Sequence, residues 1–177
     1  MFHPDMHVVT FTVFGSPQTA GSKQSFVPLH RTTKQPFRNK NGGIVVSTVD
    51  DNPKSKGWKR AVAKAAKETH KGPLLDGPLV ATFRFFRPRP KNHHAKFGLS
   101  KAGTQSIAPD TRPDVLKLAR AVEDAMIGIC YEDDAQIVEE HLFKFWGEPA
   151  RVEIEVKQMV QAEVGLFGES DLWEKTA

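Results

Sequence analysis

The segment that most restricts how this chain can fold is 113–140, where an amphipathic helical pattern runs into a cluster of carboxylates. Apolar residues recur in its first half at the i, i+3, i+4, i+7 spacing of a helix with one buried stripe. They are Val115, Leu118, Ala119, Val122, Ala125 and Met126. Pro113 suits the first helical position, and Asp114 complements the positive end of the helix dipole. Gly128 is expected to end the helix.

The second half of this segment is strongly acidic. Between Glu123 and Glu140 it contains seven acidic residues and no Lys or Arg, in a chain whose net charge is +4. Neighbouring carboxylates repel one another, and a divalent cation with oxygen ligands relieves the repulsion. We expect Asp114 and the Asp133–Asp134 pair to converge at one end of the helix. From the residues alone, the alternative is that Asp114 only complements the dipole and that Asp133–Asp134 form a turn.

Composition indicates a globular protein with a polyanionic partner. A chain of 177 residues fits one domain with a proper core, and 39% hydrophobic and 26% charged residues are ordinary for a soluble globule. The sequence pI of about 9.2 favours nucleic acid as the partner. Cys130 is the single cysteine, which excludes a disulfide within the chain, and we expect it to be a small buried hydrophobe. Without a secretory segment or a membrane-spanning apolar run, the chain is expected in the cytoplasm.

The order of elements predicts an α+β domain, with a single mixed β-sheet packed against helices. Strands are expected at 7–14, 78–86, 136–146 and 150–156, and helices at 58–69 and 113–128. The last two strands flank Gly147-Glu148-Pro149 and are expected to form a hairpin. The segment 91–109 is expected to be a flexible loop. The domain is predicted to cover 1–160, including a basic loop at 15–57, with 161–177 as a tail outside it.

The basic loop is the strongest candidate for contact with phosphates. From Gly21 to Arg60 the chain carries nine Lys or Arg against two Asp, which predicts an extended or hairpin-like segment lying along a nucleic acid. Phe26 and Phe37 either stack on bases or pack beneath the loop. Lys59 and its neighbours on the following helix face either DNA or solvent.

Two motifs in the acidic segment resemble a known family. R-P-D-V-L-K-L-A-R occupies 112–120 and D-D-A-Q-I-V occupies 133–138. Together they resemble the K-P-D-x-D-N-L-x-K and D-D-x-Q-[VI] motifs of the RusA family of Holliday junction resolvases. G-S-P at 15–17 resembles a further element of that family. The resemblance covers roughly 8–157 and implies a RusA-like α+β fold.

The resemblance also implies an activity. Family members are Mg²⁺-dependent endodeoxyribonucleases, with Mn²⁺ as a possible substitute, that nick four-way or related branched DNA symmetrically as homodimers. It implies metal ligation by Asp114 and Asp134, supported by Asp133, and neutralisation of developing charge by Lys117 or Arg120. Together with the basic composition, it suggests a set of DNA-binding residues. They are Lys23, Lys59, Arg60, Arg89, Lys91, Arg112 and Lys144.

The chain departs from the family pattern at two positions. Leu116 stands where the family has its middle Asp, and Arg120 stands where it has its catalytic Lys. Because Arg does not readily give up a proton, the role at 120 narrows to electrostatics. Asp110 or Asp124 is the candidate replacement for the missing ligand. The alternative function is a non-catalytic protein that binds branched DNA on the same scaffold.

Overall fold

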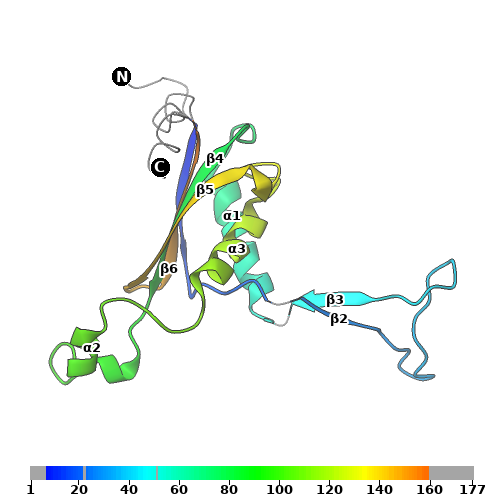
Figure 1. Cartoon of the computed structure of the whole chain (residues 1–177), viewed down its shortest axis with the longest axis horizontal. Coiled ribbons are helices and arrows are strands. Elements are labelled where there is room, and N and C mark those ends of the chain that lie inside the picture. The colour runs from blue at the N-terminus through cyan, green and yellow to red at the C-terminus, as the bar shows by residue number, and fades with distance from the viewer. Residues whose placement is uncertain (1–6, 22, 51, 160–177) are drawn as a thin grey trace, which may run out of the picture.

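The computed structural model describes residues 7–21, 23–50 and 52–159. Figure 1 shows a body made of one sheet with two helices against one of its faces, and two extensions that project from the end of this body. One extension is an arm formed by β2 and β3, and the other is a lobe that contains α2. The predicted α+β class with a mixed sheet is confirmed. In the described part of the chain, every helix is too short or too polar to cross a lipid bilayer.

The main sheet has the strand order β1–β6–β4–β5. Its strands are β1 (Val8–Phe14), β4 (Leu79–Arg87), β5 (Ile137–Trp146) and β6 (Arg151–Gln158). β6 pairs antiparallel with β1 and with β4, whereas β5 pairs parallel with β4. The predicted hairpin of β5 with β6 is therefore wrong. β4 lies between them because its apolar side chains, including the fully buried Phe83 and Phe85, favour the central position of the sheet.

The core lies between the sheet and the helices α1 (Ser55–Thr69) and α3 (Val115–Met126). Alternate residues of each strand point into it, and each helix contributes an apolar stripe, such as Leu118 and Val122 of α3. Burying a side chain of this size stabilises the fold by about 1.5–3 kcal/mol. Cys130 is fully buried, as expected, and burial raises the pKa of its thiol to about 11.

The basic segment after β1 forms a hairpin-like arm. β2 (Lys23–Phe26) and β3 (Ser47–Asp50) pair antiparallel, and isolated bridges join Leu29 to Pro36 and Arg38 to Ile44 further out. His30 and Phe37 stack with ring centroids 3.8 Å apart. Phe37 thus packs within the arm, and the hairpin form expected for this segment is present.

The segment expected to be a flexible loop contains two short helices, η1 (Lys91–His93) and α2 (Lys101–Gln105). Arg89 holds them together, because its Nη1 donates to the carbonyl oxygens of Gly103 at 2.8 Å and Ser106 at 3.1 Å. The two short helices pack so closely that a Cβ at position 103 would lie 2.2 Å from the carbonyl oxygen of His93. The expectation was wrong because polar contacts of Arg89, Ser100 and Trp146 hold this segment together, and hydrophobic periodicity does not reveal such contacts.

Candidate nucleic-acid interface and carboxylate groups

Helix α3 separates the candidate metal ligands into two groups, one at each end. Asp114 is the N-cap residue of α3, whereas Asp134 begins the 3₁₀ helix η2 (Asp134–Gln136), which follows α3 and precedes β5. The 12 residues of α3 span about 18 Å. The charge of Asp134 acts on Glu123, close to the C-terminal end of α3. The described chain therefore does not bring Asp114 and Asp134 to one end of the helix, contrary to the expectation from the sequence.

Hydrogen bonds fix the acidic loop at the far end of α3. Gln136 Nε2 donates to the carbonyl oxygens of Leu75 and Gly77, both at 3.2 Å, just before β4 begins. Its Oε1 accepts from the backbone N–H groups of Glu132 at 2.9 Å and Asp133 at 3.1 Å. The loop is thus tied to the start of β4, while Asp114 lies near the opposite end of that strand.

A pocket of about 520 Å³ opens at the N-terminal end of α3. Its charged lining consists of the cations Arg87, Arg112 and Lys117 and one carboxylate, Asp114. The loop 16–19 and Pro113 form the rest of its wall. Asp114 makes no side-chain capping hydrogen bond. Three cations beside a helix N-terminus create a site suited to a phosphate group.

Backbone contacts hold this pocket in shape. Lys144 Nζ donates to the carbonyl oxygens of Thr111 at 3.0 Å and Pro113 at 3.1 Å, and Arg87 Nη1 donates to that of Arg112 at 2.9 Å. The N–H of Ala20 donates to the carbonyl oxygen of Lys117 at 2.8 Å, which docks the loop after β1 against α3. Lys144, selected from the sequence as a DNA contact, positions the segment leading into α3. Arg87 was missed, although its place at the end of a buried strand is a usable signal.

At the other end of α3, Glu123 and Glu140 of β5 form a carboxyl pair. Burial, the hydrogen bond with Glu140, and the nearby charges of Glu140, Asp134 and Asp124 raise the pKa of Glu123 to about 8. A hydrogen bond between two carboxyl groups requires one of them to hold a proton. This pair therefore keeps a proton near neutral pH.

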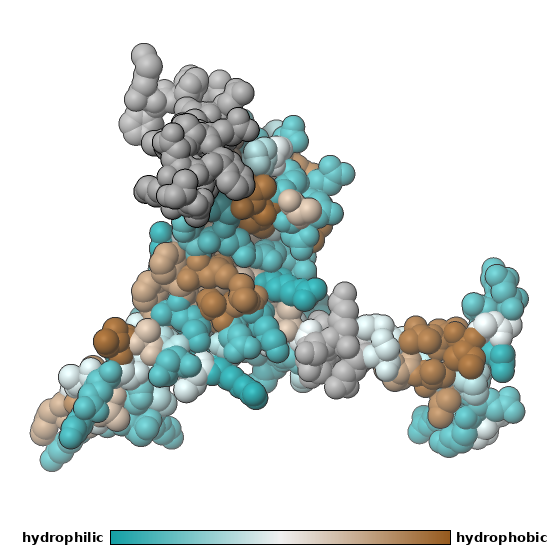
Figure 2. All heavy atoms as spheres, viewed as in Figure 1, coloured by the Kyte–Doolittle hydropathy of each residue, from teal (hydrophilic) through white to brown (hydrophobic). Residues whose placement is uncertain are grey.

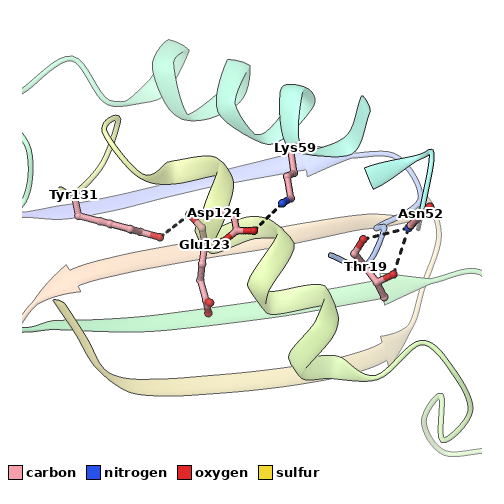
Figure 3. A network of polar contacts seen from close by, with 6 residues as sticks. All are labelled: Thr19, Asn52, Lys59, Glu123, Asp124 and Tyr131. Atoms are coloured by element: carbon pink, nitrogen blue, oxygen red, sulfur yellow. Dashed lines mark hydrogen bonds and ion pairs between the residues drawn. The ribbon is translucent and has the colours of Figure 1, made fainter. Parts of the chain in front are cut away.

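Asp124 and Glu123 are neighbours in sequence but project from different sides of α3 (Figure 3). Asp124 Oδ2 pairs with Lys59 Nζ of α1 at 2.7 Å, and Tyr131 Oη donates to the carbonyl oxygen of Glu123 at 3.1 Å. Asp124, a candidate replacement for the missing ligand, and Lys59, a candidate DNA contact, thus link the two helices to each other.

The Asp133–Asp134 pair has the turn structure of the alternative interpretation. Asp133 Oδ1 accepts from the N–H of Ala135 at 2.8 Å, and with Gln136 it forms a capping box around η2. Asp133 is therefore occupied as a capping residue. Leu116, at the position of the family's middle Asp, is 67% exposed on the same face of α3 as Arg120 and Glu123.

The remaining DNA-binding candidates are distributed over several surfaces. Arg60 lines a second pocket of about 670 Å³ beside α1, together with Lys56 and Lys59. Lys91 is exposed at the start of η1, whereas Arg89 is used inside the lobe. Lys23 begins β2, and its side chain lies outside the described part of the structure.

The described residues do not form a ready-made metal site. Within 7–21, 23–50 and 52–159, no three His, Cys, Asp or Glu side chains are grouped so that they could hold an ion. Asp114 lies among cations and Asp133 caps a helix, at opposite ends of α3. The ligand set Asp114, Asp133 and Asp134 therefore does not fit one ion in a single chain.

Comparison with known proteins gives two matches. A family model described as Endodeoxyribonuclease RusA matches residues 28–157. The chain is also 29% identical over 155 residues to "Uncharacterized protein YqaN" of Bacillus subtilis (strain 168), which covers 87% of this chain and 99% of that protein. The family match includes both groups of candidate residues at the ends of α3.

Proposed function

Because the chain belongs to the RusA family of endodeoxyribonucleases, we propose that it nicks four-way or related branched DNA. The observation that supports this best is the pocket at the start of α3, where Arg87, Arg112 and Lys117 surround a space of phosphate-binding character. Phosphate contacts of this kind supply affinity, and the shape of the branch supplies selectivity.

The pocket suits hydrolysis of a phosphodiester held among its cations. Attack on the phosphate adds negative charge to its oxygens, and the three cations that line the pocket stabilise that charge. Asp114 is the carboxylate nearest to it and can accept a hydrogen bond from the attacking water. Arg120, about one turn beyond Lys117 on α3, adds positive charge without donating a proton.

A divalent cation, Mg²⁺ first and Mn²⁺ second, belongs to the proposal as the cofactor. Bound to a phosphate, such an ion lowers the pKa of its water and offsets negative charge. The described carboxylates do not form a ligand set for it, so no step above is routed through the ion. Asp114, Asp133 and Asp134 remain candidates that variants can separate.

The proposal includes a homodimer acting in the cytoplasm of a bacterial or phage-infected cell. A four-way junction is nearly two-fold symmetric, and a C2 dimer presents two equivalent pockets to its opposed strands. Paired nicks then leave products that a ligase can seal.

The test is an end-labelled synthetic four-way junction incubated with the full chain and Mg²⁺ or Mn²⁺. We expect nicks at two symmetric positions and their loss in EDTA. Asp114→Asn and Asp134→Asn, each compared with the exposed Glu68→Gln, show which end of α3 carries the chemistry. If nicking is lost only in Asp114→Asn, the reaction takes place at the pocket. If nicking is lost only in Asp134→Asn, it takes place at the acidic end of α3.

A second candidate is a non-catalytic protein that binds branched DNA. The specific observation in its favour is Leu116, which is 67% exposed where the family has a carboxylate. Tight, junction-selective binding with no nicking under either metal identifies this function and excludes the first.

A further inference from the structure

One face of the main sheet is turned away from α1 and α3 (Figure 1). The strand register places a group of aromatic and Arg side chains on this face. We call this group the aromatic face, and it consists of Phe14, Arg84, Phe86, Phe143, Phe145 and Arg151. The strand register places it in two adjacent rows. Phe145, Phe86, Arg151 and Phe14 form one row across all four strands, and Phe143 and Arg84 belong to the next.

Phe14, Phe143 and Phe145 of the aromatic face are exposed, and Phe86 is half-buried. Phe14 is 67% exposed, Phe143 40% and Phe145 38%. Figure 2 shows hydrophobic surface gathered over the sheet next to the lobe of α2. An apolar cluster of this kind on a sheet marks a binding surface more often than a scattered single residue does.

The rings are interleaved with guanidinium groups. The Phe143 and Phe145 rings are nearly parallel, with an interplanar angle of 7° and centroids 5.8 Å apart. Arg151 lies 3.7 Å from the centre of the Phe86 ring, and Arg84 lies 5.9 Å from that of Phe143. Flat rings combined with cations provide two features that bind a single nucleic-acid strand, namely stacking for the bases and positive charge for the phosphates.

We propose that the aromatic face binds unpaired bases of single-stranded DNA by stacking. This inference rests on the proposed function for the kind of nucleic acid involved. An open four-stranded sheet with exposed rings is a surface on which splayed bases can lie flat, whatever their sequence. At a branch point such bases become available when the arms of the junction open.

The position of the aromatic face links it to the phosphate pocket. Phe86 and Arg87 are consecutive in β4, so their side chains point to opposite faces of the sheet, and Arg87 lines the pocket. Lys144 and Phe145 repeat this relationship in β5. A strand that leaves the pocket around this end of the sheet therefore arrives at the aromatic face.

Charge favours a nucleic acid over a second copy of the chain. An isologous contact sets a patch against itself, so Arg84 and Arg151 would approach their own counterparts. A polyanion complements the same cations. Glu153 neutralises Arg151 in part, with Nε to Oε1 at 2.9 Å, and Glu139 and Glu155 lie further along this face. Glu153 belongs to the same row as Arg84 and Phe143, whereas Glu139 and Glu155 lie beyond that row and confine the proposed site to the end of the sheet near the pocket.

The experiment measures binding of fluorescein-labelled oligo-dT by anisotropy, in EDTA so that no nicking occurs. The key variant is Phe143→Leu/Phe145→Leu, because leucine keeps the apolar bulk and removes the aromatic ring. We expect its affinity for oligo-dT to fall about tenfold or more, with an unchanged thermal midpoint. Phe145→Trp is expected to keep or improve binding. Phe97→Leu, at an 86% exposed position in the lobe, is the matched control and is expected to bind like the parent chain.

Two results would overturn the inference. One is unchanged oligo-dT binding by the double Leu variant. The other is a change from dimer to monomer in Phe143→Glu/Phe145→Glu, measured by sedimentation, with oligo-dT binding intact, since that assigns the face to a subunit contact. Nicking of the four-way junction is assayed separately. A chain that nicks but shows no ring-dependent binding loses only this inference, and a chain that binds through the rings but never nicks loses only the proposed function.

Discussion

The carboxyl groups of Glu123 on α3 and Glu140 on β5 are joined by a hydrogen bond, which ties the C-terminal end of the helix to an edge strand of the sheet. Such a contact exists only while one of the two groups is protonated. The stability of this part of the fold is thereby linked to pH.

The first prediction concerns Glu123→Gln. The pKa of Glu123 is raised from 4.5 to about 8. Between pH 4.5 and about 8, Glu123 therefore keeps its proton in the folded chain and loses it in the unfolded chain. The contribution of Glu123 to the free energy of unfolding is fully present below pH 4.5 and is lost as the pH rises through 8. We expect the glutamine variant to be more stable than the parent at pH 9 by about 1–2 kcal/mol, after allowing for solvent screening, and nearly equal at pH 5. Urea unfolding at the two pH values measures the difference, and Glu148→Gln is the control.

The second prediction concerns the phosphate pocket. Each cation that meets a phosphate releases counterions, so removing one lowers the salt dependence of binding. Arg112→Ala should reduce the slope of log K against log salt by about 1 and weaken binding to junction and duplex alike. Anisotropy titrations at several salt concentrations test this, with Lys64→Ala on the outer face of α1 as the control. An unchanged slope for Arg112→Ala argues against phosphate contact at the pocket.

The third prediction concerns the lobe of η1 and α2. Gly103→Ala places a Cβ against the carbonyl oxygen of His93, and Arg89→Met removes the donor that holds Gly103 and Ser106. Loss of such buried contacts costs about 1–3 kcal/mol locally. We expect proteolysis within 91–109 to become about tenfold faster, because local opening becomes more frequent. Gly98→Ala has open space around its Cβ but a positive φ, so it separates backbone strain from the steric clash at Gly103. Cleavage rates equal to those of the parent chain would contradict the role of Arg89.

The fourth prediction concerns Leu116→Asp. The substitution restores a carboxylate on the exposed face of α3 that also carries Arg120 and Glu123. If the missing carboxylate limits nicking, the aspartate variant should nick a junction about tenfold faster with Mn²⁺, in line with the contribution of a single positioned group. The asparagine of Leu116→Asn has the size of aspartate without its charge, so this variant should nick no faster than the parent chain. Equal nicking rates for the two variants would show that the missing carboxylate at position 116 does not limit nicking.

The sequence predicted the elements better than their arrangement. Hydrophobic periodicity located α3 by its buried stripe and β6 by the alternation of buried residues along the strand. It did not reveal that β4 separates β5 from β6, since strand order depends on pairing between distant segments. The RusA-like motifs identified the family, yet they place Asp114 and Asp134 as though adjacent, while a helix of 12 residues keeps them apart. Arg89 and Lys144 were selected as DNA contacts for their charge. In the structure their side chains donate hydrogen bonds to backbone carbonyl oxygens.

The position of β6 in the sheet also affects how the chain is assembled. Of the described strands β1 is synthesised first, and its neighbour in the main sheet is β6, the last of them. During translation the amino-terminal strand must therefore wait, with its edge unpaired, until nearly the entire domain has left the ribosome. Any truncation that removes β6 leaves both β1 and one side of β4 open to pairing with other chains.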